Sequence, residues 1–157
     1  MKLIIFAFVF LSLVALNALA TGLQITQIEA RVNYDDAYVY RLEQEQHMDR
    51  LTYALVPVSN GSKIDVAVFP GSNLTLAITV ENTFHGTGHK LRNVVVTATI
   101  EGVNGGEDLE EKSIDFDLEP GEDYRDDIKF YIPLDIDSGM HNVKIEAEGE
   151  EIGRAHV

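Results

Sequence analysis

The sequence predicts an all-β protein, an antiparallel β-sandwich, on three observations. Apolar residues alternate with polar or small residues over several short segments. Proline–glycine turn signals follow two of these segments, and no segment between them has a convincing helical repeat. Of the 157 residues, 45% are hydrophobic, which is enough for one domain with its own core.

The clearest strand is 74–80, where Leu74, Leu76, Ile78 and Val80 alternate with threonine and alanine. The same alternation predicts five further strands, at 64–68, 94–100, 114–118, 128–132 and 143–147. Residues 28–32 and 37–42 are expected to form two more, with the polar segment 43–50 as a surface loop or one helical turn. This N-terminal part of the chain, residues 21–60, could pack beside the sandwich or begin a small separate lobe.

Turn signals fit the same fold. Pro70-Gly71 and Pro120-Gly121 suit the two central positions of a type II turn, because proline presets φ and glycine accepts a positive φ. Each turn is expected to join neighbouring antiparallel strands. An immunoglobulin-like sandwich has about seven strands. The six strands expected within 61–150 therefore indicate an immunoglobulin-like module that lacks its last strand.

The N-terminal 20 residues have the pattern of a signal peptide. Lys2 precedes an apolar run from Leu3 to Leu16, and Ala18-Leu19-Ala20 is a small-x-small cleavage motif. We expect cleavage after Ala20, with a retained membrane anchor as the alternative. The protein is then secreted to the extracellular side or the cell surface, and loss of Lys2 changes the formal net charge from −14 to −15.

The C-terminal heptapeptide 151–157 resembles the translation of a short-read sequencing adapter and is expected to be non-native, with a frayed natural terminus as the alternative. The natural gene is expected to continue past Glu150. The chain accordingly divides into a signal peptide at 1–20, a β-rich segment at 21–60, the sandwich at 61–150 and this tail.

Charge and composition exclude several function classes. The chain has 26 Asp and Glu residues against 12 Lys and Arg residues, which argues against binding to nucleic acid or to an anionic membrane surface. It has no cysteine, so disulfides, thiolate metal sites and cysteine nucleophiles are excluded. No nucleophile elbow or phosphate-binding loop is present in the sequence, and we expect no enzymatic activity.

Five sequence segments, together with the signal peptide, resemble the N-terminal region of archaeal S-layer proteins that carry CARDB-like, immunoglobulin-like modules. The segments are 35–43 (DDAYVYRLE), 69–72 (FPGS), 80–83 (VENT), 108–111 (DLEE) and 116–121 (FDLEPG). The resemblance implies a cell-envelope location, a β-sandwich fold and long chains of such modules. It implies no catalytic residues.

Clustered carboxylates suggest a calcium site, because hard cations prefer several oxygen ligands. The candidate ligands lie in three acidic segments: Asp108, Glu110, Glu111, Asp123, Asp126, Asp135 and Asp137. The alternative is a solvated acidic surface, which needs no ligand. Calcium is the one cofactor that the sequence suggests.

Three further features bear on function. His85 and His89 could meet one metal ion if their glycine-containing loop folds back, although such a loop is more often a plain turn. Asn60 and Asn73 begin glycosylation sequons. Tyrosines at 34, 38, 40 and 53 could stack on sugars or could be ordinary strand residues.

The sequence therefore predicts a secreted, noncatalytic structural or adhesive module of the cell envelope. Its expected partners are neighbouring envelope or S-layer subunits. The alternative is an extracellular binding module that recognises surface glycans or proteins through its loops, with or without calcium.

Overall fold

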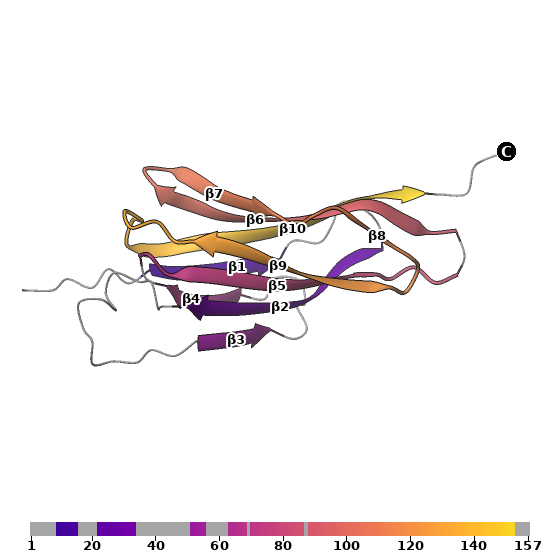
Figure 1. The fold of residues 1–157 in the computed structure, drawn as a ribbon, viewed down its shortest axis with the longest axis horizontal. Coiled ribbons are helices and arrows are strands. Elements are labelled where there is room, and N and C mark those ends of the chain that lie inside the picture. The colour runs from indigo at the N-terminus through magenta and orange to yellow at the C-terminus, as the bar shows by residue number, and fades with distance from the viewer. Residues whose placement is uncertain are drawn as a thin grey trace, which may run out of the picture.

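The computed structural model describes residues 9–15, 22–33, 51–55, 63–68, 70–86 and 88–152. Within these residues the regular elements are strands, and they form two sheets packed against each other (Figure 1). The β-sandwich predicted from the alternation is thereby confirmed.

The first sheet has four strands in the order β3-β2-β5-β9, and each neighbouring pair is antiparallel. These strands are β3 (Leu51–Leu55), β2 (Leu23–Asn33), β5 (Asn73–Asn82) and β9 (Asp123–Tyr131). The central strand β5 carries the predicted segment 74–80, and its neighbours β2 and β9 contain the predicted segment 28–32 and most of 128–132.

The second sheet has the order β4-β1-β10-β6-β7, and β8 also pairs with β6. Its strands are β4 (Lys63–Val68), β1 (Val9–Ala15), β10 (Gly139–Ile152), β6 (Lys90–Asn104), β7 (Glu107–Lys112) and β8 (Phe116–Leu118). Its pairs are antiparallel except that of β1 with β10, which is parallel.

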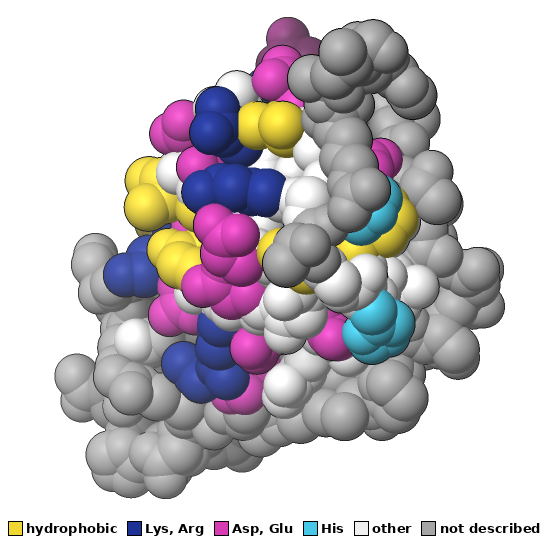
Figure 2. All heavy atoms as spheres, turned by 90° about the vertical axis from the view of Figure 1, so that its right-hand side faces the viewer, with side chains coloured by type: hydrophobic (Ala, Val, Ile, Leu, Met, Phe, Trp, Pro, Cys, Tyr) yellow, Lys and Arg dark blue, Asp and Glu magenta, His cyan; other side chains and the backbone are white. Residues whose placement is uncertain are grey.

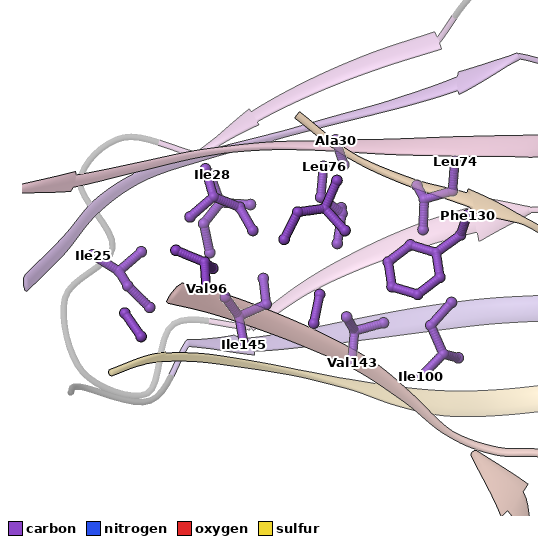
Figure 3. Close-up of a cluster of buried hydrophobic side chains, with 14 of the residues drawn as sticks. Ile25, Ile28, Ala30, Leu74, Leu76, Val96, Ile100, Phe130, Val143 and Ile145 are labelled. Atoms are coloured by element: carbon purple, nitrogen blue, oxygen red, sulfur yellow. The ribbon is translucent and has the colours of Figure 1, made fainter. Parts of the chain in front are cut away.

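The core lies between the sheets and follows the predicted alternation. Leu74, Leu76, Ile78 and Val80 of β5 are at most 1% exposed. They face the buried residues of β6 and β10, and Phe130 of β9 closes one end of the labelled cluster (Figure 3). Burial of one such large apolar side chain contributes about 1.5–3 kcal/mol, so this cluster is the main source of stability.

The two proline–glycine turns form as expected, but they connect different sheets. Gly71 and Gly121 have φ values of 81° and 77°, the positive φ that a type II turn requires of its glycine. Gly71 lies between β4 and β5, and Gly121 lies between β8 and β9, each pair being split between the two sheets. The expectation that each turn joins neighbouring strands was wrong, because a type II turn fixes the reversal but not the layer that the chain enters next.

Several observed strands differ from those that the alternation predicts. Strand β7 was not expected, since its residues are mostly acidic and exposed. Strand β8 is shorter than the predicted 114–118, and Ile114 is 67% exposed instead of buried. Strand β3 was not expected either. The predicted strand 37–42 and the polar segment 43–50 lie outside the described residues.

Both ends of the described chain contribute strands. Strand β1 lies within the apolar run assigned to the signal peptide. Strand β10 continues past Glu150 to Ile152, so it includes the first two residues of the adapter-like tail. Processing at Ala20 and the origin of the tail stay predictions.

A buried asparagine joins the loops at one end of the sandwich. Asn82 is 0% exposed, and its Nδ2 donates hydrogen bonds to the carbonyl oxygens of His89 at 2.8 Å and Leu118 at 3.1 Å. Its Oδ1 accepts a hydrogen bond from the backbone N–H of Phe84 at 3.1 Å. One amide thus holds together the segment after β5, the start of β6 and the end of β8.

Candidate functional site

The candidate calcium ligands are spread over three elements. Asp108, Glu110 and Glu111 lie on β7, Asp123 and Asp126 on β9, and Asp135 and Asp137 in the connection from β9 to β10. No group of three or more His, Asp or Glu side chains within the described residues could hold a metal ion. The calcium site therefore stays a prediction without a preformed cluster to support it in this part of the chain.

Several of these carboxylates bind nearby polar groups instead. Asp108 Oδ1 accepts a hydrogen bond from the N–H of Gly102 at 2.9 Å, and Asp137 Oδ2 accepts one from Gly105 at 3.2 Å. Asp135 Oδ2 accepts a third from Asn104 Nδ2 at 2.6 Å. Charged acceptors make strong hydrogen bonds to such groups. Some of the acidic side chains thus stabilise the turn between β6 and β7 and connect it to the loop before β10.

Next to this turn, His141 of β10 is 6% exposed and lies between two backbone carbonyls. Its Nδ1 is 3.1 Å from the carbonyl oxygen of Glu101, and its Nε2 is 2.6 Å from that of Asp137. A neutral imidazole donates at only one nitrogen, and a protonated ring donates at both. His141 thus joins β6 to the loop before β10. This role could not be predicted from the sequence, because the residue lies outside every motif.

An open groove of about 670 Å³ lies on the outer face of the four-stranded sheet. Three neighbouring strands line it, and Glu111 of β7 lies at its border. The polar lining residues on the sheet are Arg31, Asn33, Asn73, Thr75, Asp127, Lys129 and Tyr131.

Strand register explains why these residues meet. Arg31 of β2 pairs with Thr75 of β5, which pairs with Lys129 of β9. The next row is Asn33, Asn73 and Tyr131 in the same order. Because paired residues of adjacent strands point to the same face, the two rows place two cations, two amides and a phenol side by side.

The side chains that line this groove suit polar ligands. Amide, hydroxyl and guanidinium groups hydrogen-bond to sugar hydroxyls or to carboxylates, and the 54% exposed Tyr131 offers an aromatic face. Sequence alternation alone would mark 127, 129 and 131 as outward-facing, but the neighbours of these residues depend on pairing between strands that are distant along the chain.

An ion-pair cluster adjoins the groove. Glu29 lies in β2 two residues before Arg31, and its side chain is 16% exposed. Glu29 Oε1 accepts a hydrogen bond from Arg31 Nε at 2.6 Å, and Oε2 accepts one from Arg125 Nη2 at 3.3 Å. The hydrogen bond from Arg31 and the charges of both arginines lower the pKa of Glu29 below its ordinary value.

We expect Glu29→Gln to reduce the free energy of unfolding by up to about 1 kcal/mol at pH 7. A carboxyl whose folded pKa is lowered contributes stability above its unfolded pKa, and this contribution is lost as the pH falls through the folded value. The difference from the native chain should therefore shrink below about pH 4. Urea unfolding at a series of pH values measures it, with Glu148→Gln on the exposed side of β10 as the control. A difference that stays constant with pH would contradict this assignment.

The end of the molecule at which β2 begins and β10 ends has acidic and basic side chains interleaved (Figure 2). Lys90 Nζ lies 2.9 Å from Glu119 Oε1 and 3.5 Å from Asp117 Oδ2, and the hydrogen bond to Glu119 is the main reason that the pKa of Lys90 is raised. His89 stacks on Phe84 with ring centroids 4.7 Å apart, and its Nδ1 is 2.9 Å from Glu151 Oε1. His85 is exposed.

The two sequons have different positions. Asn60 lies outside the described residues, whereas Asn73 is the first residue of β5, is partly exposed and lines the outer groove. A glycan on Asn73 would stand at this groove. Glycosylation of either asparagine stays a prediction.

Comparison with known proteins finds no family model, no curated protein and no solved structure that matches this chain. The resemblance to S-layer proteins therefore stays a prediction from the sequence segments. A search of the described residues for a helix long and apolar enough to span a membrane finds none.

Proposed function

We propose that this protein is a secreted, noncatalytic module of the cell envelope with a structural or adhesive role. The observation that supports the role is its continuous apolar core. One continuous apolar cluster extends from Leu23 at one end of the sandwich to Val103 and Ile136 at the other. Close-packed interiors have low compressibility and transmit force. The described part of the module is thus suited to act as a stiff unit.

The acidic edge of the second sheet supports assembly that depends on divalent cations. Strand β7 is an edge strand, and its acidic side chains oppose direct pairing with another sheet edge. A hard cation such as calcium could bridge these carboxylates to those of a second copy. The cation site would then form between subunits, which requires no preformed cluster within one chain.

The test is assembly of the full chain in millimolar calcium and in EDTA, followed by light scattering and electron microscopy. We expect ordered or large assemblies in calcium only, and weaker assembly for Glu110→Gln combined with Glu111→Gln. The matched control is Glu146→Gln with Glu148→Gln on β10, which removes the same charge elsewhere. Assembly that ignores EDTA, or that both double variants weaken equally, would contradict the proposal.

The second candidate is recognition of surface glycans. Its support is the outer groove, where Lys129 and Tyr131 lie beside two asparagine amides. The glycan is then expected to contact the outer face of the four-stranded sheet and not the loops. Saturable binding of the monomer on a glycan array should be lost with Lys129→Ala and Tyr131→Ala. It should survive in Lys112→Ala and Leu134→Ala, which change an exposed lysine and an exposed apolar residue elsewhere.

A further inference from the structure

Strand β1 fills a space between two strands of the second sheet. On one side it pairs in parallel with β10, from Val9 with Gly139 to Ala15 with Ile145. On the other side it pairs antiparallel with β4, from Val9 with Val68 to Val14 with Lys63. A strand in this place therefore has its backbone hydrogen-bonded along both edges.

The register defines what kind of strand fits there. Leu11, Leu13 and Ala15 pair with His141, Val143 and Ile145, which are at most 6% exposed. The intervening residues Phe10 and Ser12 pair with the exposed Met140 and Asn142. The space thus requires apolar residues at alternate positions and tolerates polar residues between them.

The second sheet is protected from further strand pairing differently beyond β6 and beyond β10. On the β6 side the sheet ends in β7, whose acidic residues discourage further pairing. Among the described strands, the sheet continues beyond β10 only through β1, and β4 pairs with β1 alone. Removal of β1 would leave backbone groups of β10 unpaired next to buried apolar residues and would leave β4 without its strand partner.

That removal is what cleavage after Ala20 would do. We propose that the space between β10 and β4 is a strand-acceptor site. After cleavage it takes an extended segment, apolar at alternate positions, from a neighbouring envelope protein. Added strands gain affinity from main-chain hydrogen bonds and specificity from alternate side chains. The inference rests on the proposed export but does not require calcium-dependent assembly.

The first experiment tests the space in the unprocessed full chain. The chain has no cysteine, so Ser12→Cys with Asn142→Cys introduces a single possible intramolecular disulfide. We expect it to form under mild oxidation. The control pair, Ser12→Cys with Lys144→Cys, is displaced by two residues, which separates its Cα atoms by about 8 Å and exceeds the reach of a disulfide. Equal crosslinking of both pairs, or of neither, would overturn the proposal.

The second experiment tests exchange of the strand. The full chain carries a specific protease site in place of residues 16–21 and is cut only after folding. We expect the N-terminal fragment to stay bound in native mass spectrometry and to exchange with a labelled synthetic peptide of residues 8–16. A peptide with Leu11→Asp and Leu13→Asp should bind at least about a hundredfold more weakly, because it places charge opposite buried residues. The control peptide with Ser12→Asp and Val14→Asp carries equal charge at the exposed register and should still bind.

The outcomes separate this inference from the proposed function. Release of the fragment without uptake of peptide would overturn the acceptor site, as would equal binding of both charged peptides. Calcium-dependent assembly that persists in either case would leave the structural role in place. Strand exchange with the predicted preference for register, but without assembly, would support the acceptor site alone.

Discussion

Phe130→Ala is expected to reduce the free energy of unfolding by about 3–5 kcal/mol, the usual effect of truncating a buried phenylalanine. Phe130 is 2% exposed and lies in the core near Leu74 and Ile100, residues from the sheet partner β5 and from the opposite sheet (Figure 3). Its truncation leaves a cavity that the rigid sheets fill only in part. Domains of this size are stable by only about 5–15 kcal/mol, so the loss is a large share.

Chemical denaturation of the full chain measures this loss, with a lower midpoint and an unchanged dependence on denaturant. The matched control is Tyr131→Ala, the next residue of β9, which is 54% exposed. Its expected effect is within about 0.5 kcal/mol. Equal losses at the two positions would show that β9 does not present alternate residues to the core.

Asn82→Ala is expected to cost about 3 kcal/mol, although the side chain is polar and no core packing is removed. The substitution deletes two hydrogen bonds donated by Nδ2 and one accepted by Oδ1, and it leaves their backbone partners unsatisfied. Each buried polar group that loses its partner costs about 1–3 kcal/mol. Faster amide hydrogen exchange at Phe84, whose N–H loses its acceptor, should accompany the loss.

Two further variants make the role of Asn82 specific. Asn82→Asp retains the acceptor but replaces the donating group with a buried charge, so at pH 7 it should destabilise at least as much as Asn82→Ala. Asn142→Ala, on the exposed side of β10, should have little effect. If Asn82→Ala and Asn142→Ala had the same effect, the asparagine would not be holding the three segments together.

Alternation was a good predictor where a strand has one buried and one exposed face. It located β5, β6, β9 and β10, because each packs one face against the core. It missed β7, which is an edge strand with almost no buried residue and so carries no apolar period. It also misassigned Ile114, since three apolar residues in alternation do not reveal where pairing with β6 begins.

The candidate site was less accessible to sequence reasoning. Grouping Arg31 with Lys129 requires the register of β2, β5 and β9, which is set by pairing between distant segments. Asn82 resembles an ordinary residue at the end of a strand, and only its burial reveals its role. The acidic residues were visible, but the sequence could not show which ones bind backbone N–H groups and which remain on the surface.

The position of β1 illustrates a further limit. An apolar run with small residues at its end has the pattern of a signal peptide, and the same run can pair as a strand wherever a sheet offers a free edge. A high hydropathy is common to a signal peptide and to a buried strand. Only partners such as Val143 and Ile64, which are distant along the chain, identify the strand.

The placement of the strand ends has a mechanical consequence. The carbonyl of Gly22, just before β2, accepts a hydrogen bond from Thr83, and Glu151 of β10 contacts His89. Strand β2 thus begins and β10 ends at the same end of the molecule (Figure 1).

Tension applied between these two strand ends would separate β2 from β5 and β10 from β6, breaking the inter-strand hydrogen bonds one after another. If a strand inserted between β10 and β4 were pulled along its axis, all of its inter-strand hydrogen bonds would bear the force at the same time. Such a joint would resist tension better than the module's own strand ends.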